Sequence, residues 1–319
     1  MPYRRNLSAS FVLHDWLIKI STDDPNLIPA IRLCLPHYFR ARKKSGSLKR
    51  KTIQISLYRQ PKKIQQPPVD PEGKKQFYYP ADNVLRMIDF EKDEVSFFVG
   101  RNLKLSTNWL FHAVLLYPLS RLIRKYQAFM VHAALLEKNG SGILIMGNSG
   151  TGKSTFSAIG VQNGFRYYSD EHPLVALKDN KVVGKSFYNL IGLKPVSRKN
   201  FLDLAPKMTW SRERNKYYLD PESIHGGCLG DVCEIKKVIF PAFTPHGGKI
   251  RVKELKKKEF LKALFRDEYF NFNIGNEMSE KLSLSSFYFS ARMAGSAKGF
   301  TLDYGTACIR QLPSVLEKL

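Results

Sequence analysis

The first third of the chain alternates between apolar and polar residues over short stretches. From residue 53 to residue 57, isoleucine and leucine occupy every second position, which is the pattern of a strand with one buried face. Residues 84–90 and 95–99 are apolar runs on either side of a charged turn and predict a hairpin. A short helix is expected at 27–35, and the Pro-, Gln- and Lys-rich segment 61–80 is expected to be an exposed loop.

Longer apolar runs begin after these elements. Residues 108–125 have a helical pattern, and the run 129–136 is expected to be the first strand of a second region. A strand follows at 142–146 and a helix at 155–163, with Asn163-Gly164 as the C-cap of that helix. The next strand is expected at 165–168.

The rest of the chain continues to mix strands and helices. The pattern predicts a hairpin formed by 173–177 and 181–183 around Asp179-Asn180, a strand at 237–240, a basic helix at 255–265, a strand at 287–289 and a final segment at 315–319. We therefore expect an N-terminal α+β region at 1–128 and a catalytic α/β domain at 129–319.

A glycine-rich loop lies between the strand at 142–146 and the helix at 155–163. It reads Gly147-Asn148-Ser149-Gly150-Thr151-Gly152-Lys153-Ser154, and Thr155 follows it. The glycines allow successive backbone N–H groups to surround phosphates, Lys153 supplies a positive charge, and the Ser154 hydroxyl is placed for Mg²⁺. The loop and Thr155 are therefore expected to bind ATP with Mg²⁺.

Composition restricts the partners. The 319 residues include 51 Lys and Arg and 28 Asp and Glu, a net charge of +23, which attracts nucleic acid, anionic membranes or acidic proteins. The basic run within 40–51 matches no nucleic-acid-binding module, so we interpret it as a basic loop and disfavour nucleic acid as a partner. The apolar stretch 109–119 falls short of the roughly 20 residues that a membrane span needs. Four cysteines and the lack of a secretory signal predict a reducing, cytoplasmic setting.

Three titratable residues are candidates for chemistry beside the loop. Asp170 and Glu171 follow the strand at 165–168, so their carboxylates are expected near the phosphates, where one can hold Mg²⁺ and the other can orient or deprotonate an attacking hydroxyl. His132 lies in the run at 129–136. From the residues alone, a packed core histidine is the simpler interpretation of it.

The spacing of these residues resembles the catalytic core of the HPr kinase/phosphorylase family and its relatives, which include HPr-kinase-like proteins that phosphorylate serine in small peptides. The resemblance covers residues 131–175. It consists of His132 in the stretch His132-Ala133-Ala134-Leu135-Leu136, 15 residues before Gly147, Gly164 at 11 residues after Lys153, and Asp170-Glu171 beginning 17 residues after Lys153.

The resemblance implies a mixed-sheet P-loop kinase core of the HPr kinase and phosphoenolpyruvate carboxykinase type. It implies that Lys153 holds phosphate, that Ser154 and Asp170 hold the metal, and that the acidic pair also supplies the catalytic base next to His132. The chain departs from the family pattern at Glu171, where aspartate is usual, at Ala133, where HPr kinases have glycine, and at 184–199, which is basic and has no carboxylate. A divergent relative is therefore expected rather than an HPr kinase itself.

Two further groups are weaker candidates. A cation from Arg212, Arg214 or Lys216 could neutralise charge on a transferred phosphoryl group, although a solvated basic turn is the simpler interpretation. His225, Cys228 and Cys233 have a poor spacing for zinc.

We therefore expect an ATP- and Mg²⁺-dependent kinase that acts on a serine or other hydroxyl of a peptide, protein or small molecule. The basic charge is compatible with an acidic acceptor. The alternatives are a nucleotide-binding regulatory module, a polyanion-binding module or a plain NTPase without kinase activity. The sequence is compatible with a homo-oligomer but does not set its size.

Overall fold

The computed structural model describes residues 7–34, 50–60, 75–81, 83–101, 103, 106, 109–265 and 280–319. The chain forms two compact units, Met1–Tyr126 and Gln127–Leu319. Most of the predicted basic loop within 40–51, and most of the predicted loop at 61–80, lie outside the described residues.

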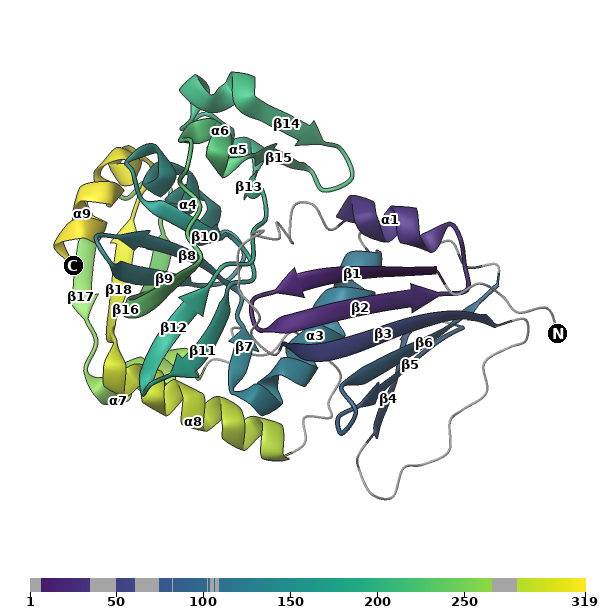
Figure 1. Ribbon diagram of the computed structural model, residues 1–319. Coiled ribbons are helices and arrows are strands. Elements are labelled where there is room, and N and C mark those ends of the chain that lie inside the picture. Colours follow the sequence, from purple (N-terminus) through teal and green to yellow (C-terminus); the bar gives the residue numbers. More distant parts are fainter. Residues whose placement is uncertain are drawn as a thin grey trace. The chain divides into compact units, whose positions relative to one another are not determined.

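Within its described residues, the first unit contains one six-stranded sheet and a short helix, α1 (Leu27–Cys34), which confirms the predicted helix (Figure 1). In sheet order the strands are β1 (Leu7–Leu13), β2 (Trp16–Thr22), β3 (Lys51–Gln60), β6 (Glu94–Gly100), β5 (Val84–Asp89) and β4 (Lys75–Ala81). The β2–β3 and β3–β6 pairs are parallel, and the outer pairs are antiparallel. Ile53, Ile55 and Leu57 of β3 are all buried, as their alternation predicts.

Two predictions in this unit need correction or refinement. The expected loop at 61–80 is wrong at its end, because Lys75 begins β4, which pairs with β5 at the edge of the sheet; an edge strand tolerates Pro80. The expected helix at 108–125 is confirmed as three consecutive segments, the π-helix η1 (Leu110–Leu116), α3 (Tyr117–Leu122) and the 3₁₀-helix η2 (Ile123–Tyr126). Pro118 lacks a backbone N–H, which is a reason for the change of hydrogen-bond pattern there.

The second unit is a mixed α/β structure, and strand β16 pairs with three other strands of its sheet. Along the main path the strands are β10 (Arg166–Ser169), β8 (Ala133–Lys138), β9 (Ser141–Met146), β16 (Val232–Phe243), β12 (Lys181–Lys185), β11 (Leu174–Lys178) and β7 (Ala128–Met130), and β18 (Lys298–Tyr304) pairs with both β16 and β17 (Arg251–Glu254). Strand β16 is parallel to β9 and β18, whereas the other pairs are antiparallel.

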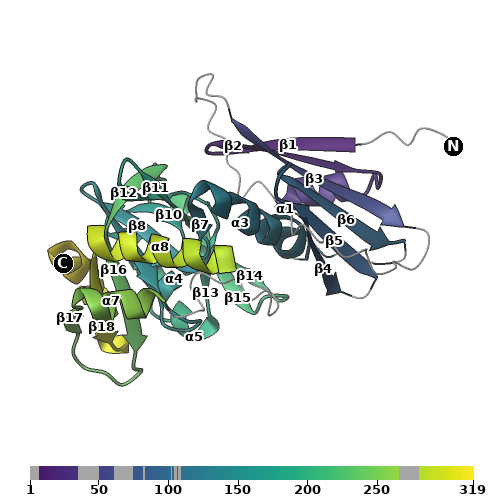
Figure 2. The same ribbon diagram turned by 90° about the horizontal axis from the view of Figure 1, so that it is seen from below.

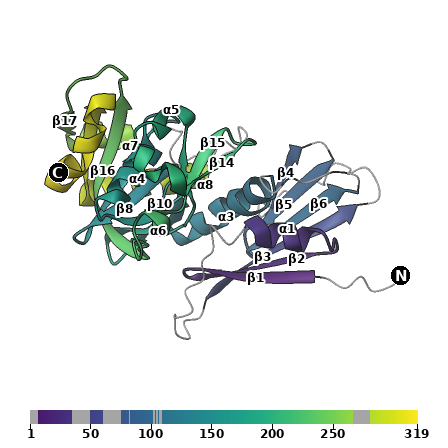
Figure 3. The same ribbon diagram turned by 90° about the horizontal axis from the view of Figure 1, so that it is seen from above.

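Helices cover both faces of this sheet. Ile143 and Ile145 of β9 pack with α4 (Lys153–Gln162) and α9 (Leu312–Lys318), while Leu144 and Met146 pack with α7 (Lys257–Leu264) and α8 (Glu280–Ser296). The alternation follows from the period of two in a strand. Figure 2 shows α8 across one face, and Figure 3 shows α4 on the other.

A small sheet adjoins this core. Its strands are β13 (Ile191–Leu193), β15 (Lys216–Leu219) and β14 (Met208–Ser211), and its short helical segments are α5 (Pro195–Arg198), η3 (Leu202–Lys207) and α6 (Pro221–Ile224). The sequence patterns did not predict these elements. The 3₁₀-helix η4 (Thr306–Gln311) leads from β18 into α9.

The predicted strand at 129–136 is two strands. The backbone N–H groups of Val131 and Ala133 donate to the carbonyls of Pro173 and Glu171, each at 3.2 Å. Strand β7 therefore pairs with β11, whereas β8 pairs with β9 and β10. The apolar run continues through the break because both strands are buried, so hydrophobicity alone did not reveal it.

The predicted strand at 287–289 is wrong, because these residues belong to α8. Phe289 and Met293 are four positions apart and both are buried, whereas Phe287 and Tyr288 are about half exposed. This spacing is typical of one buried helix face. No helix in the described ranges is long and apolar enough to cross a membrane.

Candidate functional site

The glycine-rich loop connects β9 to α4, which is the strand–loop–helix context that the sequence predicts. Gly150 and Gly152 have φ angles of 96° and 99°, a left-handed conformation that side chains other than glycine rarely adopt. Helix α4 begins at Lys153, and residues of the loop and of the first turn of the helix line one cavity. N–H groups at the start of a helix lack partners within the helix and can bind anions.

Tyr304 at the end of β18 supports this loop. Its hydroxyl donates a hydrogen bond to the Thr151 carbonyl at 3.0 Å, and the Thr151 hydroxyl donates to the Asn148 carbonyl at 2.9 Å. A Cβ atom on Gly152 would lie 1.7 Å from the Tyr304 oxygen. Only glycine fits at position 152 while Tyr304 holds the loop in this way.

Lys153 extends its side chain back along the loop. Its Nζ atom donates to the carbonyls of Gly147 at 2.5 Å and Asn148 at 3.1 Å. Burial lowers its pKa to about 8, against the opposing effect of the nearby carboxylates of Asp170 and Glu171. The ammonium group is therefore largely charged at neutral pH.

Asp170 follows β10 and is 1% exposed. Its carboxylate accepts hydrogen bonds from the Ser157 hydroxyl at 2.7 Å and from the Gly192 N–H at 3.3 Å, and the Asn189 side chain accepts from its backbone N–H at 2.9 Å. Burial raises the pKa of Asp170 to about 6, although hydrogen bonds from Ser157 and Ser154 act in the opposite direction. The carboxylate is thus fixed in position and lacks the solvent that would stabilise its charge.

Glu171 has a different environment. Its Oε1 atom accepts a hydrogen bond from Lys216 Nζ at 3.2 Å, and its Oε2 atom lies 3.9 Å from His172 Nε2. Burial acts to raise the pKa of Glu171, but the charges of His172 and Lys216 outweigh it and bring the pKa to about 2. The side chain of Glu171 is 31% exposed, so an ionised carboxylate faces the cavity beside the buried Asp170.

His132 lies at the break between β7 and β8. Its ring centre is 6.1 Å from that of His172. Burial and the charge of Lys153 lower its pKa to about 4. His132 is therefore a neutral imidazole at physiological pH.

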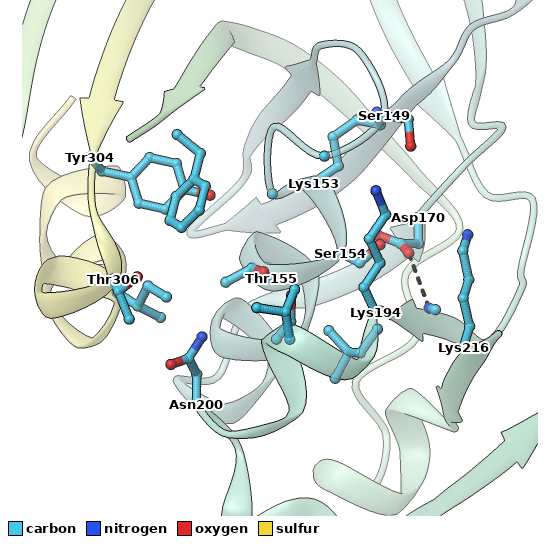
Figure 4. A pocket seen from close by; sticks show the side chains of 18 of the residues that line it. Ser149, Lys153, Ser154, Thr155, Asp170, Lys194, Asn200, Lys216, Tyr304 and Thr306 are labelled. Atoms are coloured by element: carbon cyan, nitrogen blue, oxygen red, sulfur yellow. Dashed lines mark hydrogen bonds between the residues drawn. The ribbon is translucent and has the colours of Figure 1, made fainter. Parts of the chain in front are cut away.

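A cavity of about 300 Å³ brings the predicted residues together (Figure 4). It is lined by His132, Lys153, Ser154, Thr155, Asp170 and Glu171, and from the loop also by Ser149, Gly150 and Gly152. Gly147, Asn148 and Thr151, which were also expected to bind the nucleotide, are not among the lining residues. Of the three basic residues considered as a source of positive charge, Lys216 lines the cavity, whereas Arg212 and Arg214 are on the exposed β14–β15 turn.

Cys228 and Cys233 are separated by the sheet. Cys228 packs in the cluster on the α4 face, and Cys233 packs in the cluster on the α7 and α8 face. Burial raises both thiol pKa values, to about 11 and about 12 respectively. The pair considered for zinc therefore does not converge on one point.

Comparisons with known proteins give limited information. A family model described as SynChlorMet cassette protein ScmC matches residues 101–186, a range that includes the loop and the acidic pair. No curated protein matches. A structure of the HPr(Ser) kinase/phosphatase from Coxiella burnetii aligns with 60% of this chain and 93% of its own chain, at 13% identity and a TM-score of 0.30. This is a distant likeness of fold at most.

Several residues of the cavity were not candidates from the sequence. Lys194 and Asn200 flank α5, Tyr304 ends β18, and Thr306 begins η4 (Figure 4). Tyr304 is separated from Thr151 by 153 positions. No local motif links such distant segments, but the basic character of 184–199, noted above as a departure, was a signal for Lys194.

Proposed function

We propose that the protein is an ATP- and Mg²⁺-dependent kinase that transfers the γ-phosphoryl group to a serine or other hydroxyl of a peptide, protein or small molecule. One observation carries the proposal: Lys153 and Ser154 of the phosphate-binding loop share a single cavity with the paired carboxylates of Asp170 and Glu171. Phosphoryl transfer depends mainly on positioning and on stabilising charge, and this set of groups supplies both.

The chemistry of the donors fits Mg²⁺. Ser154 and Asp170 offer a hydroxyl and a carboxylate that are close enough to interact, and oxygen ligands of this kind are those that Mg²⁺ prefers. The raised pKa of Asp170 means that the loss of solvent around its ionised form outweighs the favourable contacts that the protein alone provides. When bound, Mg²⁺ would neutralise charge on the β- and γ-phosphates.

The other roles in the proposed reaction are assigned to residues of the protein. The loop N–H groups and Lys153 bind the phosphates, with Lys153 exchanging its two carbonyl contacts for phosphate oxygens. Glu171 is the carboxylate on the more exposed side of the pair, so it is assigned to accept the hydrogen bond of the attacking hydroxyl. His132, which is neutral, lines the cavity near Glu171.

Transfer of labelled γ-phosphate from MgATP to a panel of serine peptides, including acidic ones, tests the proposal. The full-length chain is expected to label an acceptor, whereas Lys153→Met and Asp170→Asn are expected to label none. Lys258→Ala is the matched control, because Lys258 is exposed on α7, on the opposite face of the sheet from α4. Release of inorganic phosphate at a rate that no acceptor redirects would instead identify an NTPase, and labelling that survives in both variants would refute the proposed site.

A further inference from the structure

Lys194 extends from the end of β13 toward the phosphate-binding loop. The distance from its Nζ atom to the position that a Cβ atom would occupy on Gly150 is 3.6 Å. Figure 4 shows its ammonium group directed into the cavity, in the region of Ser154 and Asp170. The lysine therefore faces the loop from the small sheet, across the space that the phosphates need.

The backbone fixes the base of this side chain. The Gly192 N–H donates to the Asp170 carboxylate at 3.3 Å, which anchors β13 beside the acidic pair. Lys194 directly follows Leu193, the last residue of β13, and has an extended backbone conformation with a ψ angle of 153°. Pro195 at the first position of α5 restricts the backbone immediately after it.

Three other lysines line the cavity, and the two that interact with the acidic pair, Lys153 and Lys216, already have partners within the protein. Lys153 donates to the carbonyls of Gly147 and Asn148, and Lys216 donates to Glu171. Among the described residues, Lys194 Nζ has no hydrogen bond and no ion pair. It is exposed, so it can move the short distance needed to reach a ligand.

The charge near the loop agrees with a role for Lys194 in holding an additional anion. The proximity of Lys194 is one of the effects that lower the pKa of Lys153, which indicates that the two ammonium groups repel each other in the protein alone. A phosphate group between them would remove this repulsion. A diphosphate bound along the loop would engage Lys153, whereas a third phosphate extends the charge toward the acidic pair and Lys194.

We propose that Lys194 binds the terminal phosphate of a nucleoside triphosphate, so that it makes the site select triphosphate over diphosphate and stabilises the phosphoryl group as it is transferred. The selectivity for triphosphate does not require kinase activity, whereas the role of Lys194 in phosphoryl transfer rests on the proposed function. The role is that of a cation supplied from within the same chain.

The first test compares binding of the magnesium complexes of ADP and of a non-hydrolysable ATP analogue to the full-length chain, by calorimetry. In Lys194→Met, which keeps the length of the side chain and removes its charge, the preference for the triphosphate is expected to fall by about ten- to a hundredfold, while ADP affinity changes little. Lys194→Arg is expected to retain most of the preference. Lys258→Ala controls for the loss of one positive charge.

The second test measures transfer. In Lys194→Met the turnover number is expected to fall by roughly a hundredfold or more, with little change in the KM of the acceptor. An unchanged triphosphate preference, or an equal loss of ADP and triphosphate binding, would overturn the proposal. The Lys194→Arg variant and the ADP measurement report whether the site is folded. If Lys194→Met loses both ADP binding and its melting transition, it has misfolded, and Lys194→Gln replaces it in the test. If the unmodified chain binds no nucleotide, the proposed function itself fails.

Discussion

Replacing Asp170 with asparagine is expected to stabilise the nucleotide-free protein, although it should abolish phosphoryl transfer. Asp170 is 1% exposed, and burial raises its pKa to about 6 from an ordinary value of 3.8. Because the folded pKa is the higher one, the folded protein binds the proton more tightly. The resulting stabilisation is complete below about pH 3.8 and is lost as the pH rises through about 6.

The magnitude follows from this difference of about two pKa units. Each unit corresponds to about 1.4 kcal/mol, so ionisation of Asp170 lowers the free energy of unfolding by about 3 kcal/mol above about pH 7. Asparagine keeps an acceptor for Ser157, but its amide N–H₂ would face the Gly192 N–H, which now donates to Asp170 at 3.3 Å. Loss of that hydrogen bond costs about 1 kcal/mol. A net gain of about 2 kcal/mol remains, or roughly 4–8 °C in Tm for a unit of this size.

Thermal unfolding of the full-length chain without nucleotide, at about pH 8 and about pH 4, measures this gain. The variant is expected to be more stable than the unmodified protein at the higher pH and no more stable at the lower one. Asp303→Asn is the matched control, because Asp303 is exposed on β18. A gain of the same size at both pH values, or no gain at the higher pH, would show that desolvation of the Asp170 charge is not what raises its pKa.

The other predictions concern single contacts of the site. Lys153→Met should weaken triphosphate binding, measured by calorimetry, by about a hundredfold, because a charged donor to phosphate is lost. Undiminished binding would show that Lys153 does not bind the phosphates. Tyr304→Phe removes the hydrogen bond to the Thr151 carbonyl and should weaken nucleotide binding by about fivefold without loss of folding. His132→Asn should leave the pH dependence of the rate unchanged above about pH 5, because the pKa of His132 is about 4; a shifted acidic limb would show that His132 titrates in turnover.

Local sequence patterns predicted the elements whose own residues form a recognisable apolar, helical or turn pattern. The strand, loop and helix around Gly147–Ser154 follow from an apolar run, glycines and a helical segment, and the hairpin around Asp179-Asn180 follows from two residues that tolerate positive φ angles of 49° and 62°. The hairpin of β1 and β2, with His14 and Asp15 between the strands, was not predicted. These two residues form the turn itself, with His14 at a φ of 48°.

The parts of the site that were missed depend on contacts between distant segments. Lys194 reaches Gly150 because β13 is anchored on Asp170, and Tyr304 reaches Thr151 because β18 lies beside β16. Neither contact has a spacing that could be recognised along the chain. Proximity of this kind arises from the order of strands in the sheet, which alternation of apolar residues does not specify.

Glu171 and Lys216 form an ion pair, and their roles are interpreted together. An aspartate in place of Glu171 would be shorter by one methylene, about 1.5 Å. The present distance of 3.2 Å to Lys216 Nζ is near the limit of a hydrogen bond, so a shorter side chain in the same backbone would lose the contact. The extra methylene is thus matched to a lysine on β15.

In the proposed kinase reaction, this pairing bears on how the acceptor hydroxyl would be activated. A carboxylate with a pKa of about 2 is a weak base, so Glu171 is poorly suited to remove a proton before the phosphoryl group begins to move. It is well suited to orient the hydroxyl and to accept the proton late. That order agrees with a loose transition state, in which the attacking oxygen gains little bonding before the leaving bond has largely broken. In such a reaction the position of Glu171, which Lys216 sets, matters more than its basicity.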